Sequence, residues 1–293
     1  RARTRSGTAL DVRYAGSARL LSASVSPARI TVGKEATVRA CWTADASMDT
    51  DYTVFVHLIG PAATRPGERH TYPGLGKYPT SAWVPGQAFC DTYVVPVETW
   101  ASAPIRYRIE LGLYDASTGE RPAAYSADDH PFDPPVVGSL NVVPAGALGT
   151  EPQHPLTVDF GSAIRMVGYD LTGTGTAGSA VPVTLHWEAT AEPLYDYVAF
   201  VHLRSPGDAA PLAQHDSQPR EGWYPTSAWK EGDRIPDEHA LHIPETLPSG
   251  TYSLWAGLYL PHDGIRLAAE FEGNRLPDDL VPLGPLQIVR ATQ

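Results

Sequence analysis

The sequence has 293 residues, 42% of them hydrophobic and 19% charged, which is the composition of a folded globular protein rather than a disordered one. Its formal net charge of −11 argues against a nucleic-acid partner and against docking on anionic lipid, because both need a basic surface. No run approaches the roughly 20 apolar residues that span a bilayer, so we predict no membrane insertion by this chain.

The chain starts with Arg1 and its first methionine is Met48, so we expect a piece or a processed form of a longer protein. One hexapeptide, YPTSAW, then occurs twice, as Tyr78–Trp83 and as Tyr224–Trp229. Shorter matches on both sides of it keep nearly the same separation along the chain, which predicts a tandem duplication. The predicted parts are a loose leader (1–10), a first repeat (11–143), a linker (144–156) and a second repeat (157–293).

Within each repeat, apolar and polar residues alternate with the period of two that is typical of a half-buried β-strand. The alternation is clearest at residues 105–113 and again at 252–258. Residues 53–58 and 198–203 are apolar on both faces, as expected for a strand covered on each side. With 28 prolines and 26 glycines for turns, the sequence predicts two tandem antiparallel β-sandwich domains. The pattern leaves open whether their wiring is immunoglobulin-like or jelly-roll.

The hexapeptide allows two interpretations. In the functional one, the rings form a platform that stacks on a sugar face; the residues concerned are Tyr78, Trp83, Trp223, Tyr224 and Trp229. In the structural one, which we favour, a tryptophan buried at the edge of the sandwich holds a long connection between strands, and burial of its ring contributes a few kcal/mol.

A histidine lies in the same apolar strand of each repeat, at His57 and His202. A buried neutral imidazole needs partners for its ring nitrogens. The aspartates that follow the hexapeptide, Asp91 and Asp237, are the partners we predict, as structural polar pairs. The alternative is a catalytic or metal-binding His–Asp pair, with a hydrolase that uses His202 and Asp237 as its least favoured form.

The sequence predicts no catalytic residues, no metal site and no cofactor. A serine nucleophile would need a base beside it and a strained turn such as Gly-x-Ser-x-Gly, which the hexapeptide serines lack. A zinc site needs three or four ligands, and no His-x-His or Cys-x-x-Cys spacing occurs. At the place where the second repeat has His215-Asp216, the first has His70 without the acid, so we expect no shared metal site there.

Both cysteines, Cys41 and Cys90, lie in the first repeat, and their counterparts in the second are His186 and Pro236. Two cysteines that occur together in one repeat favour a disulfide between strands in an oxidising compartment over two free thiols.

The repeated residues as a set resemble a known family. The set comprises Trp42, Asp51-Tyr52, Phe55–Leu58, Tyr78–Trp83, Gly86, Asp91, Gly112–Tyr114, Gly119 and Arg121, with their counterparts in the second repeat. It is similar to the soluble C-terminal region of large membrane proteins of Chloroflexota-type bacteria, which are described as dolichyl-phosphate-mannose-type glycosyltransferases. The resemblance implies an extracytoplasmic pair of domains whose parent enzyme has its active site elsewhere.

We therefore predict a non-catalytic extracytoplasmic accessory or recognition module, tethered at the cell surface through a larger membrane protein. Its predicted partner is a glycan, a cell-envelope polymer or the parent membrane enzyme. The main alternative is a scaffold for protein–protein interaction.

Overall fold

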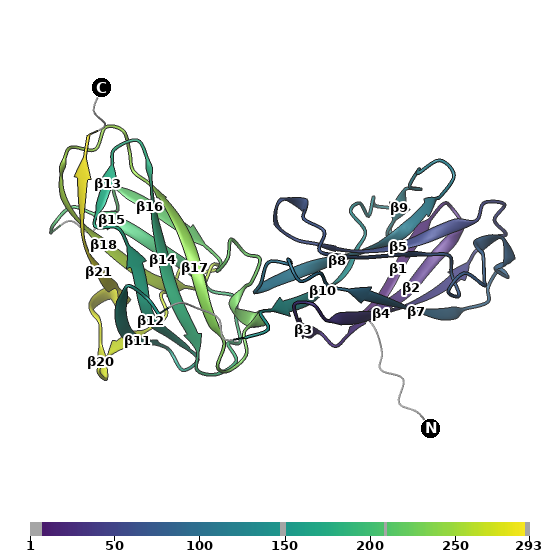
Figure 1. Cartoon of the computed structure of the whole chain (residues 1–293), viewed down its shortest axis with the longest axis horizontal. Coiled ribbons are helices and arrows are strands. Elements are labelled where there is room, and N and C mark those ends of the chain that lie inside the picture. Colours follow the sequence, from purple (N-terminus) through teal and green to yellow (C-terminus); the bar gives the residue numbers. More distant parts are fainter. Residues whose placement is uncertain (1–7, 147–150, 208–209, 291–293) are drawn as a thin grey trace. The chain divides into compact units, whose positions relative to one another are not determined.

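The computed structural model describes residues 8–146, 151–207 and 210–290, and this part of the chain is all-β (Figure 1). The chain divides into two compact units, Arg1–Ala145 and Gly146–Gln293. The predicted leader is wrong for residues 8–10, which belong to the first strand, while residues 1–7 lie outside the described part. The predicted linker is too long, because a strand starts at His154; its residues 147–150 are also outside the described part. No helix among the described residues could cross a membrane.

The described residues of unit 1 form ten strands in two sheets. The strands are β1 (Thr8–Tyr14), β2 (Ala18–Ser26), β3 (Arg29–Thr31), β4 (Glu35–Ala44), β5 (Tyr52–Ile59), β6 (Gly67–Thr71), β7 (Phe89–Pro96), β8 (Ile105–Asp115), β9 (Ala124–Tyr125) and β10 (Val136–Val143). One sheet has the order β7-β4-β2-β1-β9 and the other the order β3-β10-β8-β5-β6. Two 3-10 turns, η1 (Pro61–Ala63) and η2 (Thr80–Ala82), lie in the connections.

Unit 2 is wired in the same way. Its strands are β11 (His154–Phe160), β12 (Ile164–Leu171), β13 (Thr174–Thr176), β14 (Ala180–Ala189), β15 (Val198–Arg204), β16 (Ala213–Ser217), β17 (Arg234–His242), β18 (Gly250–Tyr259), β19 (Ala269–Phe271), β20 (Asn274–Arg275) and β21 (Val281–Val289). Its sheets have the orders β17-β14-β12-β11-β19-β20 and β13-β21-β18-β15-β16. The 3-10 turns are η3 (Thr226–Ala228) and η4 (Pro277–Asp279).

The strand order answers the question that the sequence left open. In each unit a short strand runs parallel to the last long strand, β3 with β10 and β13 with β21, while the other ladders are antiparallel. An early strand that leaves the first sheet and joins the edge of the second is a feature of immunoglobulin-like sandwiches. Both units therefore have an immunoglobulin-like order rather than that of a jelly roll.

The core of each unit lies between its two sheets and follows the predicted alternation. In β8, Tyr107, Ile109 and Leu111 are at most 1% exposed, whereas the residues between them reach solvent. The hydroxyl of Tyr14, on β1 of the opposite sheet, donates a 2.7 Å hydrogen bond to the carbonyl of Leu111. This bond joins the two layers through the core and satisfies the one polar atom of a buried ring.

One glycine in each unit allows a ring to lie flat on the outer face of a sheet. A Cβ atom on Gly112 would stand 2.7 Å from Phe55 Cζ, and one on Gly257 would stand 2.5 Å from Phe200 Cζ. Each glycine sits opposite its phenylalanine in the ladder of β5 with β8 or of β15 with β18. Any larger residue would displace the ring, so the repeated Gly-Leu-Tyr motif is explained by packing.

The predicted disulfide is confirmed. Cys41 and Cys90 face each other in the register of β4 and β7, and their sulfur atoms are bonded. Cys90 is exposed and Cys41 half-buried, so the bond lies on the outer surface of its sheet. In unit 2, His186 and Pro236 are opposite each other at the same place, so only unit 1 carries this covalent link.

We expect removal of the disulfide to destabilise unit 1 alone. The bond closes a loop with a sequence separation of 49 residues, and a link of this kind typically contributes about 2–4 kcal/mol by restricting the unfolded chain. Amide hydrogen exchange on the full chain carrying Cys41→Ala and Cys90→Ala should show lower protection in unit 1 and unchanged protection in unit 2. Unchanged protection of unit 1 would contradict this expectation.

Candidate functional site

The two hexapeptides form matching 3-10 turns with a buried tryptophan. Trp83 is 3% exposed and Trp229 is 1% exposed. Each indole Nε1 donates to the carbonyl of the tyrosine that opens its hexapeptide, Tyr78 at 3.3 Å and Tyr224 at 3.0 Å. Each indole thus bonds the first residue of its own hexapeptide and holds the turn together from within.

A buried threonine in each hexapeptide fastens the loop that precedes the central strand. Thr80 Oγ1 donates to the Thr50 carbonyl at 2.6 Å and accepts from the Tyr52 amide at 2.9 Å. In unit 2, Thr226 Oγ1 makes the same two bonds with Tyr195 and Tyr197, at 2.6 and 3.0 Å. Both threonines are fully buried, so these bonds satisfy backbone groups that water cannot reach.

The ligand-platform interpretation of the hexapeptide is therefore wrong for its three buried rings. Trp83, Tyr224 and Trp229 are buried and have no face free for a sugar. Tyr78 and Trp223 are half-buried, and the Tyr78 ring lies edge-on against Phe89, 4.9 Å away. The favoured structural interpretation agrees with the observed burial and hydrogen bonds.

The predicted pairing of His57 with Asp91 is also wrong. Asp91 lies on β7 and His57 on β5, which belong to different sheets. The Asp91 carboxylate accepts instead from the Gly74 and Thr92 amides, at 2.7 and 2.8 Å. It secures the connection that leads into the hexapeptide, and His57 finds its partner on the neighbouring strand β6.

In unit 2 the predicted pair of His202 and Asp237 fails for the same reason. His202 Nε2 lies 3.2 Å from Asp216 Oδ1 on β16. Asp237 is fully buried on β17, where it accepts from Trp187 Nε1 at 3.3 Å and from the Arg220 amide at 2.8 Å. A hydrolase built on His202 and Asp237 has no geometric basis, because His202 pairs with Asp216 and the Asp237 carboxylate is held by Trp187 and the Arg220 amide.

Asp237 instead begins a chain of ionisable side chains that leads toward the surface. His239 Nε2 lies 3.1 Å from the Asp237 carboxylate, and His239 Nδ1 lies 2.9 Å from His215 Nδ1. His215 Nε2 in turn lies 3.4 Å from the exposed carboxylate of Glu221. His239 thus pairs directly with the buried Asp237 carboxylate, and His215 pairs with His239.

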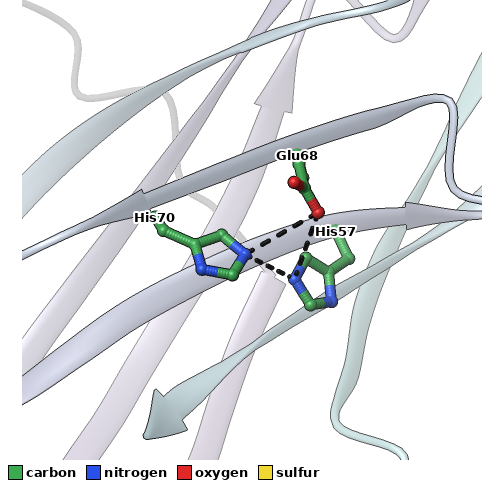
Figure 2. A group of neighbouring side chains, drawn as sticks. All are labelled: His57, Glu68 and His70. Atoms are coloured by element: carbon green, nitrogen blue, oxygen red, sulfur yellow. Dashed lines mark hydrogen bonds and ion pairs between the residues drawn. The ribbon is translucent and has the colours of Figure 1, made fainter. Parts of the chain in front are cut away.

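The most concentrated group of metal-ligating side chains in the described residues consists of His57, Glu68 and His70 (Figure 2). His57 Nε2 lies 2.8 Å from His70 Nε2. Glu68 Oε2 lies 3.9 Å from the first nitrogen and 3.8 Å from the second. His57 comes from β5, while Glu68 and His70 are two residues apart on β6 and therefore share a face. We call these three residues the β5–β6 cluster.

The cluster combines a buried member with two accessible ones. His57 is 0% exposed, while the Glu68 and His70 side chains are 53% and 37% exposed. Burial, together with the charges of Arg65 and Arg121 and the neighbouring His70, lowers the pKa of His57 to about 3. His57 is therefore a neutral imidazole at physiological pH, the form in which histidine binds metal ions.

Neighbouring side chains hold the cluster in place. The His57 ring stacks on Phe55, with 4.6 Å between centroids, and His70 Nδ1 lies 3.1 Å from the Tyr114 hydroxyl. The Arg121 guanidinium lies over the Phe55 ring, 4.2 Å from its centroid. Phe55 and Tyr114 thus restrict the orientation of the two imidazoles.

The same frame is present in unit 2 with different functional groups. The Phe200 and His202 rings are tilted against each other with 4.5 Å between centroids, and Arg266 lies 5.5 Å from the centroid of Phe200. The strand register places Gln214 opposite His202, as Glu68 is opposite His57. Asp216 takes the place of His70, so unit 2 presents one imidazole where unit 1 presents two.

Sequence reasoning missed the β5–β6 cluster because its members come from two strands. The available signal was Glu68-x-His70, whose alternation places both side chains on one face of a strand. Only the pairing register of β5 with β6 reveals that His57 faces them. The expectation of no metal site was based on ligand spacings within one segment, such as His-x-His, and these cannot reveal ligands that come from two strands.

Comparison with known proteins gives no family for this chain. No family model matches the sequence, and no curated protein matches it. Among solved structures, a DUF4785 family protein from Legionella pneumophila aligns with a TM-score of 0.27 at 10% sequence identity. The alignment covers 91% of this chain and 57% of that protein, so the chain spans little more than half of its length. A likeness this low carries no argument about function.

We predict that Thr80→Val destabilises unit 1 while Ser81→Ala does not. Valine has nearly the same shape but leaves the Thr50 carbonyl and the Tyr52 amide unpaired, and each buried unpaired group costs about 1–3 kcal/mol. Ser81 is exposed, and its contact with Asp51 uses the backbone amide, which alanine keeps. Hydrogen exchange on the full chain should show the loss in unit 1 for Thr80→Val only. Equal protection in both variants would contradict the assigned role of the hydroxyl.

Proposed function

We propose that the chain is a non-catalytic extracytoplasmic accessory module that recognises a partner protein while attached to a larger membrane protein. The observation that carries this proposal is the exposed disulfide Cys41–Cys90, because such bonds persist in oxidising compartments and are rare in the cytosol. The net charge of −11 fits a partner other than nucleic acid. The resemblance to the C-terminal region of membrane glycosyltransferases supports the same location.

The surface that best fits recognition is one end of unit 2. The register of β15 with β18 pairs Val198 with Tyr259, so the loop before β15 and the loop after β18 lie at the same end. Three large apolar side chains in these loops are strongly exposed: Leu194 at 84%, Tyr195 at 57% and Ile265 at 63%. By analogy with other immunoglobulin-like sandwiches, end loops on a rigid frame are suited to binding.

The hexapeptide supports this surface from beneath. Thr226 Oγ1 bonds the backbone at Tyr195 and Tyr197, and the Ser227 amide donates to Asp196 Oδ1 at 2.9 Å. A loop held in this way loses little conformational entropy when a partner binds. The exposed side chains include two aliphatic ones, while Trp83 and Trp229 of the hexapeptides are buried. This favours a protein partner over a glycan.

The extracytoplasmic location has a direct test in cells. Denatured protein taken from its native host, with thiols blocked at lysis, should react with maleimide at Cys41 and Cys90 only after reduction. Mass spectrometry of the labelled peptides reads both positions. Labelling of both cysteines without reduction would place the chain in a reducing compartment and remove the proposal.

The recognition surface is tested with Leu194→Ser and Ile265→Ser combined. Immobilised wild-type chain should retain a defined protein from detergent-solubilised envelopes, and the double variant should retain at least about tenfold less, as expected when anchoring apolar side chains are lost. Val289→Ser is the matched control, because Val289 is 40% exposed and ends the strand at the opposite end of unit 2. Retention that does not distinguish the two variants would contradict the surface, and retention of polysaccharide alone would favour a glycan ligand.

A further inference from the structure

The β5–β6 cluster has the composition of a metal site. Two imidazoles and one carboxylate are a ligand set used by zinc, with the fourth position taken by water. The three ligand atoms of His57, Glu68 and His70 all lie within 4.8 Å of one another. They converge from two adjacent strands toward one point, as Figure 2 shows. We propose that His57 Nε2, His70 Nε2 and the Glu68 carboxylate bind a divalent transition-metal ion, with Zn²⁺ as the best match.

The distances agree with this assignment after small side-chain movements. Zinc–nitrogen bonds of about 2.0–2.1 Å in a tetrahedron separate two ligand atoms by roughly 3.3 Å. The present separations are 2.8 Å between the nitrogens and 3.9 and 3.8 Å from them to Glu68. An ion would move the two rings apart and draw the carboxylate closer, by about half an ångström in each case. Glu68 and His70 are partly exposed, which leaves room for this adjustment.

The surroundings define how the ion would be held. His57 is positioned by its stack on Phe55, and its Nδ1, which has no hydrogen-bond partner among the described residues, carries the proton when Nε2 binds. His70 Nδ1 can donate to the Tyr114 hydroxyl at 3.1 Å. A hydrogen bond from the second ring nitrogen is the usual way in which a metal-bound histidine is oriented. The partly exposed side of the cluster gives the ion access and leaves one position to water.

Arg65 and Arg121 both place positive charge near His57 and oppose the ion, Arg65 through direct contact with a ligand. Arg65 Nη1 lies 3.3 Å from Glu68 Oε2, the oxygen that faces the two imidazoles. The Arg65 side chain is 44% exposed, so it can turn into solvent when the ion binds. Its ion pair with Glu68 is then lost, which lowers the affinity for the metal. Removal of Arg65 should accordingly tighten binding.

Unit 2 supplies an internal comparison. The equivalent positions hold His202, Gln214 and Asp216 in the same register. A carboxamide is a poor zinc ligand, and one imidazole with one carboxylate falls short of the three ligands that zinc sites use. Metal binding is thus expected of unit 1 and not of unit 2, although both have the same fold. The inference is independent of the proposed recognition role.

The test uses the full chain without a polyhistidine tag, freed of metal with a chelator and then titrated with Zn²⁺ by calorimetry. We expect one strong site, whose association constant falls at least about tenfold in His70→Ala and in Glu68→Gln, since each removes a ligand. Arg65→Gln should raise the constant, and Asp216→Ala in unit 2 should leave it unchanged. Titration with Co²⁺ should give the visible absorption of a tetrahedral site, absent in His70→Ala.

A gain of binding completes the experiment. In the His70→Ala background, Gln214→Glu together with Asp216→His should create the same ligand set in unit 2 and restore Zn²⁺ binding. Far-ultraviolet circular dichroism and hydrogen exchange verify that each variant is folded. No saturable binding, or binding that His70→Ala and Glu68→Gln leave intact, would overturn the proposal. The two imidazoles would then be a hydrogen-bonded pair.

Discussion

The two sandwiches share one constraint, a buried threonine hydroxyl that bonds backbone groups at one end. Thr80 and Thr226 connect their turn to the loop before the central strand, where the backbone has no strand to pair with. Without the hydroxyl, an amide and a carbonyl would be buried and unpaired, which costs more than the hydrogen bonds themselves contribute. The tryptophan three residues later is buried as well. This combined requirement explains why the threonine and the tryptophan of the hexapeptide are the same in the two units.

Most of the fold follows from residues that repeat. The alternation at 105–113 predicts a strand with one face in the core, and the structure buries Tyr107, Ile109 and Leu111 as expected. The choice of a structural role for the hexapeptide also agrees with the observed burial of Trp83 and Trp229. The two cysteines of the chain both lie in unit 1, and this alone predicts that they pair with each other. These features are local, or depend on composition, and need no knowledge of which strands are neighbours.

The polar partners could not be predicted in this way, because they depend on which sheet each strand joins. His57 and Asp91 lie in repeated segments, which made them natural partners, yet their strands belong to opposite layers. The true partner, His70, is on an edge strand whose sequence differs between the units. A partner across a ladder is set by the register, and a shift of one residue would turn Glu68 and His70 to the other face.

The residues that maintain the fold are thus different from those whose functional groups differ between the two units. Phe55 and Phe200 lie on glycines at equivalent places, and an arginine covers each ring. On that common frame the outer edge carries Glu68 and His70 in one unit and Gln214 and Asp216 in the other. Exchange of these partly exposed residues leaves the core packing unaltered. An edge strand beside a rigid, buried imidazole is therefore where a sandwich of this kind can change its polar side chains at little cost in stability.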